Sequence, residues 1–161
     1  MYEDAKSDEI WKPLIHQNQQ VEGYFVSNYG TILGKKGNPL KWNMNNTGNY
    51  PRVGLTLPKE QFSHYTNNSG TNNVKTNAKV HVLVADAHLP FEDNLPAVWD
   101  EFVELDGRQL KLWDLMTHYQ KEILRSAYYI DHIDSDKMNA HTSNLRYVSP
   151  RENSHAHHYG I

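Results

Sequence analysis

Four polar residues near the C-terminus have the types and spacing needed for chemistry at a metal ion: Asp131, His132, Asn144 and Asn153. The carboxylate of Asp131 and the amide oxygen of Asn153 are hard ligands that suit Mg²⁺, an ion that keeps several water ligands and commonly binds a substrate phosphate. His132 follows Asp131 directly, so on a strand it points to the other side of the pleat and can act as a general base on water. Asn144 is placed to help hold that imidazole in one tautomer. The alternative is that Asp131 and His132 form an exposed strand end before a turn.

The local sequence predicts the elements that would bring these residues together. The expected order is a strand at 128–130, a turn at 134–137 and a second strand at 144–148. Ser149 as an N-cap, Pro150 at the first helical position and Glu152 three residues after the cap predict a final helix with a capping box. The order strand, loop, strand, helix therefore allows Asn153, one turn into the helix, to converge with the end of the first strand.

Upstream, the sequence predicts a small sheet, a polar loop and three helices. The expected elements are a small meandering sheet of strands and tight turns over 21–57, a long polar hairpin loop over 58–77, and two amphipathic helices over 96–126 that are separated at Gly107. The apolar segment 80–87 could be a helix or a buried strand, and its context favours a helix. The loop is predicted because its asparagine-rich composition offers too little apolar surface for a core segment. The two helices are predicted because apolar residues such as Val98, Phe102 and Leu105 recur at three- and four-residue spacing.

Length and composition exclude several classes of protein. The 161 residues allow one compact domain or two very small modules. The chain has no cysteine, which excludes disulfides, iron–sulfur clusters and thiolate zinc sites, so a metal has to be held by His, Asn or carboxylates. Because no run of about 18 apolar residues and no signal-peptide pattern is present, we expect a cytoplasmic protein with no membrane partner.

Charge is segregated along the chain, although the formal net charge is only −3. Residues 21–81 hold seven basic and two acidic residues, whereas residues 82–106 hold seven acidic residues and no Lys or Arg. A basic first half predicts a polyanion-binding surface on one module, with an ordinary solvated face as the alternative. The candidate contacts in this module are Lys35, Lys36, Lys41 and Arg52. Together with nearby Asn and Tyr side chains they could position phosphates and contact base edges.

Three further residues lie close in sequence to the proposed metal ligands. Arg146 and Arg151 flank them and could bind phosphates, with ordinary surface arginines as the alternative. His157 lies four residues after Asn153 and so shares its helix face, where it could contact the metal or a phosphate.

The arrangement of Asp131, His132, Asn144 and Asn153 resembles the motif of HNH endonucleases. The wider sequence resembles the phage homing-endonuclease branch of that family over residues 80–87, 130–134, 137–139, 143–148 and 150–153. Residues 9–15 and 23–30 resemble the nuclease-associated modular motif that often precedes this catalytic unit. The resemblance implies an α+β fold, with a small β-rich N-terminal DNA-contacting module at 1–79. It places a C-terminal ββα-metal unit, also called a His-Me finger, at 80–161.

The resemblance also implies a role for each site residue. Asp131 and Asn153 would hold one divalent cation, Mg²⁺ or Mn²⁺, while His132 activates water and Asn144 orients His132. The implied reaction is hydrolysis of duplex DNA by a site-preferring nickase or double-strand cutter, which leaves 5′-phosphate and 3′-hydroxyl ends. A phage-encoded enzyme of this kind would act in the cytoplasm of the host cell. A monomer would favour nicking, and a dimer would favour paired cuts.

An acidic insertion at about 91–127 departs from the family pattern. It would repel a duplex, so we expect it on the far side, where it could support a homodimer or bind a protein partner. His88 stands where the family usually has an aromatic residue, and we expect only packing to change. Two other functions stay open on the same fold: a catalytically silent DNA-binding regulator and a host-interaction protein.

Overall fold

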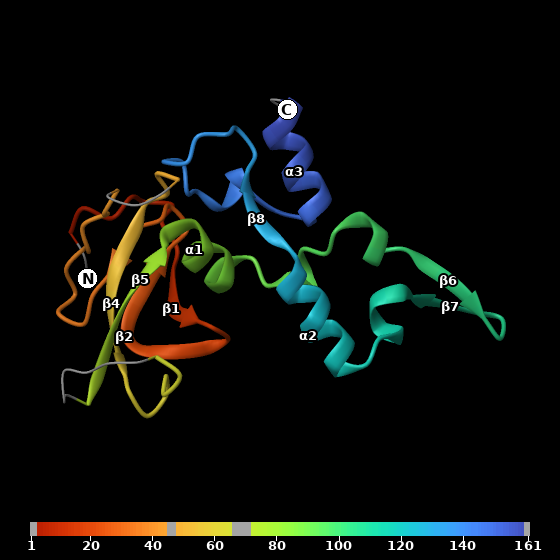
Figure 1. Ribbon diagram of the computed structural model, residues 1–161, viewed down its shortest axis with the longest axis horizontal. Helices are drawn as coiled ribbons and strands as arrows, with labels where there is room; N and C mark the ends of the chain where they lie inside the picture. The colour runs from red at the N-terminus through yellow and green to blue at the C-terminus, as the bar shows by residue number, and fades with distance from the viewer. Residues whose placement is uncertain (1–2, 45–47, 66–71, 160–161) are drawn as a thin grey trace.

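The structure, a computed structural model, describes residues 3–44, 48–65 and 72–159, except for the side chains of residues 155–159. Within these residues nine strands form four small antiparallel sheets, accompanied by three α-helices, and this architecture confirms the α+β class. Figure 1 shows the first two sheets at one end of the molecule, α1 (Val80–His88) in the middle, and an inserted arm at the other end. In the described part of the chain, no helix has the length and apolar character needed to cross a membrane.

Two separate sheets form the N-terminal part. The first contains β1 (Trp11–His16), β2 (Gln19–Ser27) and β3 (Ile32–Leu33), and the second is the hairpin of β4 (Arg52–Pro58) and β5 (Asn73–Lys79). In β4, Val53, Leu55 and Leu57 are buried and alternate with more exposed residues, which is typical of a strand with one face on the core. The single meander predicted over 21–57 is therefore wrong. Alternation predicts which residues form strands, but it does not predict which strands pair.

The polar segment 58–77 contributes to the core, contrary to the prediction. Phe62 is completely buried, and its ring centroid lies 5.6 Å from that of His16 and 6.4 Å from that of Tyr65. The connection is also shorter than predicted, because β5 already begins at residue 73. The predicted loop residues 66–71 lie outside the described residues. One large aromatic side chain can anchor a polar loop, and average composition does not reveal it.

Helix α1, predicted at 80–87, is the central packing element. It lies against β1 and β2, and it also contacts β8 (Tyr129–His132). Its buried apolar side chains belong to one hydrophobic core that runs from Leu14 in β1 to Leu145 near the C-terminus. The Nε2 of His88 lies 2.8 Å from the backbone oxygen of Val26, so this residue ties the end of α1 to β2. That contact agrees with the packing role expected for His88.

The insertion contains a hairpin and one α-helix, so the first of the two helices predicted over 96–126 is wrong. β6 (Phe102–Leu105) and β7 (Arg108–Lys111) pair around Asp106 and Gly107, whose φ angles are 51° and 73°. Positive φ at both central residues is required by a type I′ turn, which Asp-Gly favours. Over so few residues the spacing of apolar residues suits either a helix or a strand. The turn between them determines that the chain forms a hairpin. The second predicted helix is present as α2 (His118–Ala127).

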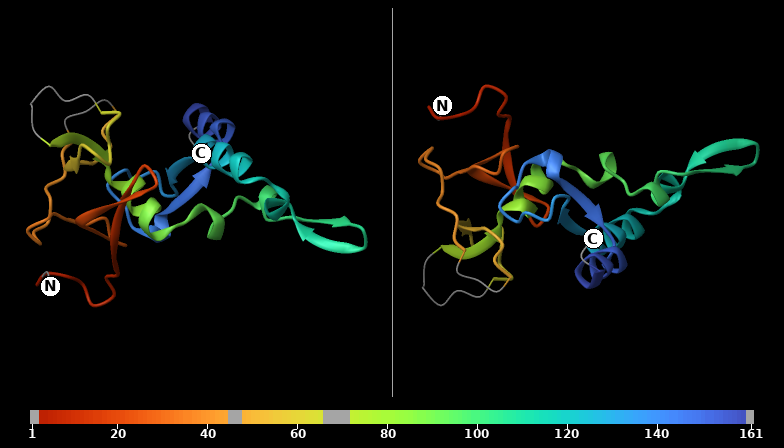
Figure 2. Two further views of the ribbon diagram at one scale, coloured as in Figure 1. Left: turned by 90° about the horizontal axis from the view of Figure 1, so that it is seen from below. Right: turned by 90° about the horizontal axis from the view of Figure 1, so that it is seen from above.

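Figure 2 shows the β6–β7 hairpin extending away from the rest of the molecule as an arm. An aromatic cluster attaches the base of this arm to the C-terminal unit. The ring centroid of Phe91 lies 5.5, 5.3 and 4.9 Å from those of Trp113, Tyr128 and Tyr147. The indole Nε1 of Trp99 donates a 2.8 Å hydrogen bond to the Tyr128 hydroxyl. Three short 3₁₀ turns shape the chain around this cluster: Phe91–Asp93, Ala97–Trp99 and Leu112–Leu115.

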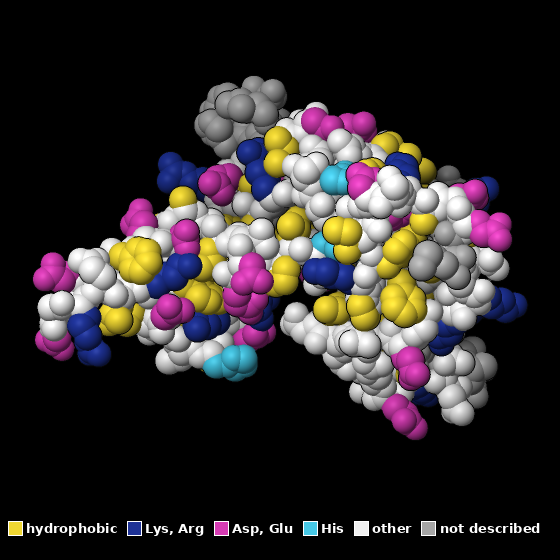
Figure 3. Space-filling view, turned by 180° about the vertical axis from the view of Figure 1, so that it is seen from behind, with side chains coloured by type: hydrophobic (Ala, Val, Ile, Leu, Met, Phe, Trp, Pro, Cys, Tyr) yellow, Lys and Arg dark blue, Asp and Glu magenta, His cyan; other side chains and the backbone are white. Residues whose placement is uncertain are grey.

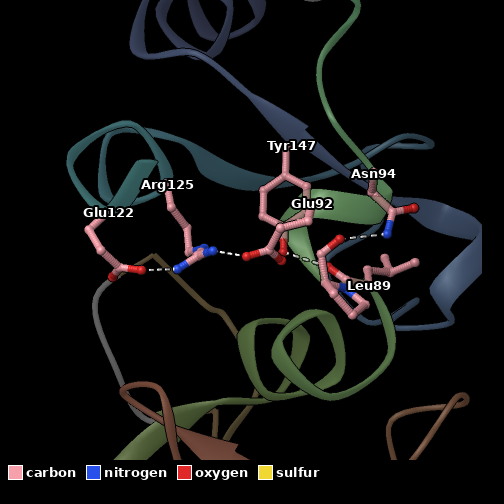
Figure 4. A network of polar contacts seen from close by, with 7 residues as sticks. Leu89, Glu92, Asn94, Glu122, Arg125 and Tyr147 are labelled. Atoms are coloured by element: carbon pink, nitrogen blue, oxygen red, sulfur yellow. Dashed lines mark hydrogen bonds and ion pairs between the residues drawn. The ribbon is translucent and has the colours of Figure 1, made fainter. Parts of the chain in front are cut away.

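Polar contacts reinforce the same junction, as Figure 4 shows. Arg125 in α2 pairs with both Glu92 and Glu122. The hydroxyl of Tyr147 donates a 2.7 Å hydrogen bond to the backbone oxygen of Leu89, just after α1. The insertion is therefore fixed at its base to α1 and to the C-terminal unit.

The C-terminal unit has the predicted order of strand, loop, strand and helix. β8 pairs antiparallel with β9 (Leu145–Val148), and α3 (Pro150–Tyr159) follows. The N–H of Ser149 donates to Oε2 of Glu152 at 2.7 Å, and the N–H of Glu152 donates to Oγ of Ser149 at 3.2 Å, which confirms the predicted capping box. Asn144 ends a short 3₁₀ turn and does not open the strand, because β9 begins one residue later.

Candidate active site

The β8–β9 hairpin places Asp131 and His132 on opposite faces. Asp131 is paired with Arg146 in the ladder, and His132 is paired with Leu145. The Nε of Arg146 lies 3.0 Å from Oδ2 of Asp131 in a pair whose arginine is about half exposed, whereas His132 is only 5% exposed. Alternation along one strand thus produces a charged face that carries Asp131 and a buried face that carries His132.

A small polar cavity beside Asp131 brings the two predicted metal ligands together. Its volume is about 190 Å³, and it is lined by Asp131, Arg146, Tyr147, Val148, Glu152 and Asn153. Asn153 reaches this cavity because the capping box starts α3 directly after β9, and its N–H donates a 2.9 Å hydrogen bond to the backbone oxygen of Ser149. The cavity therefore joins one residue of β8 to one residue of α3, as the motif requires.

The donors around this cavity fit a hard divalent cation. Asp131 supplies a carboxylate and Asn153 an amide oxygen, and Mg²⁺ takes such oxygen ligands while it keeps several waters. The described residues contain no group of three or more His, Cys, Asp or Glu side chains that could hold a metal.

Burial prepares His132 to act as a base. Burial lowers the pKa of the imidazole, and the nearby carboxylates of Asp131, Asp134 and Asp136 oppose this shift. The Nε2 atom of His132 is buried and has no hydrogen-bond partner among the described residues. A neutral imidazole can accept a proton from water, which is the role predicted for His132.

Asn144 holds the loop that follows His132. Its Oδ1 accepts a 3.0 Å hydrogen bond from the N–H of Asp134, and its Nδ2 donates to Asp134 Oδ1 at 2.9 Å and to the backbone oxygen of Asn139 at 2.8 Å. Its backbone oxygen accepts a 2.8 Å bond from the N–H of Ile133. Hydrogen bonds from Asn139 and Asn144 lower the pKa of Asp134, whose carboxylate accepts them. Asn144 therefore supports His132 through the backbone that leaves β8.

Two ring side chains beside His132 have no assigned role in the sequence motif. His81 of α1 is 4% exposed, and its ring centroid lies 4.7 Å from that of His132. Tyr50, just before β4, is stacked on His132 with centroids 6.0 Å apart and planes 24° apart, and its centroid lies 5.0 Å from that of His81. No local sequence signal relates residues so far apart, because only the packing of α1 between the modules brings them together.

Positive charge gathers around this ring cluster. The Nζ atoms of Lys79 and Lys137 lie 5.1 and 4.7 Å from the centroid of the Tyr50 ring. Burial lowers the pKa of His81 to about 3, and His132 adds to the shift. His81 is therefore neutral near pH 7, while the two lysines supply cations that the motif did not predict.

The predicted DNA-contacting residues have different surroundings. Lys35, Lys36 and Lys41 are exposed in the segment between β3 and β4, and Arg151 is exposed in the first turn of α3. Arg52 is partly buried: its Nη1 donates a 3.3 Å hydrogen bond to the backbone oxygen of Asn77, and its Nε has no partner among the described residues. Arg146 pairs with Asp131. His157 lies in α3, but its side chain is outside the described part of the structure.

Comparison with known proteins agrees with the sequence motif. Residues 124–155 match the model of an HNH endonuclease family, so the match covers β8, β9 and the first half of α3. The chain is also similar in structure to the HNH homing endonuclease I-HmuI, solved in a study of its DNA binding and cleavage. The TM-score is 0.51 and the sequences are 22% identical. The similarity covers 94% of this chain and 59% of that chain, so this chain spans about three fifths of its structural neighbour. A comparison with curated proteins gave no significant match. The predicted resemblance to HNH endonucleases is confirmed over residues 124–155, and the structural similarity confirms the predicted fold class.

Proposed function

We propose that this protein is a metal-dependent HNH endonuclease that hydrolyses phosphodiester bonds of duplex DNA. The observation that carries the proposal is the arrangement of β8 and α3. Asp131 and Asn153 line one polar cavity, and the buried His132 lies on the opposite face of the same strand. These residues belong to the segment that matches the HNH endonuclease model.

In this proposal Asp131 and Asn153 hold one divalent cation, Mg²⁺ or Mn²⁺. A cation held there would supply charge stabilisation for the phosphorane and the leaving 3′ oxygen, and hydrolysis of that bond would give 5′-phosphate and 3′-hydroxyl ends. Arg146 pairs with Asp131 and lines the same cavity, so its guanidinium is positioned to bind a phosphate oxygen there.

His132 takes a proton from the attacking water. Because burial lowers its pKa, the imidazole is neutral and ready to accept that proton near pH 7. Asn144 supports the position of His132 by holding the loop after β8. The protein therefore contributes orientation and proton transfer, while the cation contributes charge stabilisation.

The DNA lies, in this proposal, across the basic N-terminal module and the charged face of β8. Lys35, Lys36, Lys41 and Arg151 supply exposed cations for phosphate contacts. Lys79 and Lys137 add charge near the ring cluster. The arm extends away from α3 and from the N-terminal sheets, so its carboxylates are kept apart from this path (Figures 1 and 2).

The finer features of the activity are part of the same proposal. The enzyme acts as a site-preferring nickase when monomeric and makes paired cuts when dimeric, since each chain carries one site. A phage-encoded enzyme of this kind acts in the host cytoplasm.

The arm could bind a second copy or a protein partner, because Phe102 and Leu105 are 63% and 51% exposed on it. Figure 3 shows hydrophobic side chains exposed on the arm among acidic and basic ones.

The experiment that tests the proposal is cleavage of supercoiled plasmid and phage DNA with Mg²⁺, Mn²⁺ or EDTA, comparing wild type with His132→Ala purified in parallel. We expect metal-dependent conversion to open-circular or linear DNA that His132→Ala lacks. DNA binding in Ca²⁺, measured by gel shift, should be the same for both proteins. Equal cleavage by both would identify a contaminant. Binding without cleavage in any divalent metal would favour the silent DNA-binding regulator.

A further inference from the structure

Two lysines from different parts of the chain lie against the same aromatic ring. Lys79 ends β5 directly before α1, and Lys137 lies in the loop between β8 and β9. Their Nζ atoms are 5.1 and 4.7 Å from the centroid of the Tyr50 ring. The N-terminal module and the C-terminal unit therefore each supply one cation to a single place on the boundary between them.

Neither ammonium group is neutralised by a carboxylate. Among the described residues, no ion pair includes Lys79 or Lys137. The carboxylates of Asp134 and Asp136, on the same loop as Lys137, accept hydrogen bonds from within that loop and its end. Lys137 donates one hydrogen bond, at 2.7 Å to the backbone oxygen of Gly48, and an ammonium group has two further N–H donors. Two unpaired cations beside one ring repel each other, so an anion bound between them is favoured.

Other parts of the fold add to the positive potential at this boundary. The pKa of His81 is lowered to about 3 by burial, by His132, and by the charges on Lys79 and Arg52, so both cations act on the same side chain. Lys79 is also the N-cap of α1, and the described first turn of this helix has no acidic residue to offset the positive end of the helix dipole. Side chains and helix therefore favour an anion at the same place.

We propose that Lys79 and Lys137 together bind one backbone phosphate of the DNA substrate. This phosphate is a neighbour of the one that is hydrolysed. Tyr50 lies against His132, whereas the cavity proposed for the cation lies beside Asp131, on the opposite face of β8. The inference rests on the proposed nuclease function, since it takes DNA as the ligand, and it adds a contact that neither module makes alone.

The chemistry of the two side chains determines what this site recognises. A lysine ammonium group is a compact point charge with rotatable donors, so two of them suit the non-bridging oxygens of one phosphate. A phosphate contact fixes the register of the strand and carries no sequence information. The site therefore anchors the strand next to His132 on DNA of any sequence.

The test is binding of a short labelled duplex to the full chain in Ca²⁺ over a series of KCl concentrations. The proteins are wild type, Lys79→Gln, Lys137→Gln and the double variant. Glutamine removes the charge but keeps an N–H donor for the contact with Gly48. We expect each single variant to raise the dissociation constant at least about threefold, on two duplexes of unrelated sequence alike. In the double variant the slope of log K against log salt should fall by about one, the value for one phosphate.

The matched control is Lys121→Gln in α2. The Nζ of Lys121 also lies near an aromatic ring, 5.3 Å from the centroid of Trp113, and its loss changes the net charge by the same amount. We expect Lys121→Gln to bind both duplexes within about twofold of wild type, because it lies on the insertion. Lys79→Arg and Lys137→Arg, which keep the charge, should recover most of the affinity that the glutamine variants lose.

Three results would overturn the proposal. Equal losses in Lys121→Gln and in the two boundary variants would mean that only net charge matters. Unchanged dissociation constants in both single variants would exclude the contact, whether or not the double variant folds. A fall in slope of about two would place the lysines on separate phosphates.

Cleavage of the same duplexes with Mg²⁺ or Mn²⁺ separates this inference from the nuclease function. A wild type that cleaves nothing, while the variants bind as expected, would reject the nuclease function and leave the phosphate site in place. A wild type that cleaves, with binding unchanged in the variants, would reject only the phosphate site.

Discussion

At the scale of single residues, Asp131 is assigned two interactions, one of which affects folding stability and the other catalysis. Its carboxylate pairs with the exposed Arg146, and in the proposed nuclease it would also be the charged ligand of the cation. An exposed ion pair contributes little to folding, whereas a metal ligand contributes directly to catalysis. A substitution at this position should therefore separate stability from activity.

We predict that Asp131→Asn lowers the single-turnover cleavage rate by at least about 100-fold, because the cation's electrostatic stabilisation is worth several kcal/mol. The free energy of unfolding should change by less than about 1 kcal/mol. Plasmid cleavage and urea denaturation measure the two quantities, and Glu104→Gln on the exposed arm is the control. Cleavage by Asp131→Asn within twofold of wild type would exclude Asp131 as a ligand.

His81 also predicts how stability depends on pH. Its pKa falls from 6.5 in the unfolded chain to about 3 in the folded protein. Above pH 6.5 both states are neutral and the contribution of His81 is fully present. Below pH 6.5 the unfolded chain takes up a proton that the folded protein does not, so the free energy of unfolding declines toward pH 3. Asp86, whose pKa burial raises from 3.8 to about 6, has the opposite effect between those values.

The contribution of His81 can be isolated by comparing wild type with His81→Leu. Between pH 7.5 and pH 5.0 we expect the wild type to lose about 2 kcal/mol more unfolding free energy than the variant, because only the wild type carries the shifted histidine. Urea denaturation at the two pH values measures the difference. Equal losses would mean that His81 is not kept neutral by burial.

At the scale of elements, the start of α3 connects folding to the site. The Ser149–Glu152 capping box begins the helix directly after β9, and this start places Asn153 at the cavity that Asp131 lines. The start of α2 also has a capping box, in which the Thr117 side chain accepts from the N–H of Gln120 and the Gln120 side chain accepts from the N–H of Thr117. The N-cap side chain can therefore be removed from a helix beside the cavity, α3, and from a helix away from it, α2.

We predict that Ser149→Ala and Thr117→Ala each lower the free energy of unfolding by about 1 kcal/mol, the usual cost of losing an N-cap. Only Ser149→Ala should also weaken Mg²⁺ activation, seen as a higher Mg²⁺ concentration for half-maximal cleavage. Thermal denaturation and Mg²⁺ titration of the cleavage rate measure both effects. A similar shift in Thr117→Ala would show that the effect comes from general loss of stability.

At the scale of the whole molecule, the insertion is attached firmly at its base but extends outward at its tip. Phe91 and its aromatic neighbours hold the base, and β6 and β7 form an arm whose side chains are mostly exposed. The backbone N–H of Leu112 donates a 2.8 Å hydrogen bond to the oxygen of Glu101, so the chain is closed below the arm. The arm can therefore be removed above that hydrogen bond without disrupting the contacts at the base of the insertion.

We predict that replacing residues 102–111 by an Asn-Gly turn leaves the cleavage rate of a short duplex within about twofold of wild type, because the arm is remote from Asp131 and Asn153. The melting temperature should fall by only a few degrees, since few buried side chains are lost. Gel assays and thermal denaturation test both expectations. A tenfold loss of cleavage in a folded variant would place the arm in the catalytic or DNA-binding machinery.

The parts of the fold that could be predicted from sequence are those specified by neighbouring residues. The capping residues of α3, the apolar run of α1 and the strand residues around Ile130 act over a few positions, so their patterns can be recognised directly. The spacing from Asp131 to Asn153 then predicted a metal site, which stays a prediction. The arm was predicted wrongly because its apolar residues suit both a helix and a hairpin, and positive φ at Asp106 and Gly107 selects the hairpin.

The sequence by itself therefore determined the strand, loop, strand and helix order of the C-terminal unit and the types of residue at the proposed metal site. Only the tertiary structure decided that Phe62 anchors a polar loop, that Arg146 pairs with Asp131, and that His81 and Tyr50 lie against His132. The physical reason is the distance along the sequence over which each interaction acts. Caps and periodic patterns depend on interactions a few residues apart, whereas the surroundings of His132 depend on how α1 buries its apolar side chains between two distant parts of the chain.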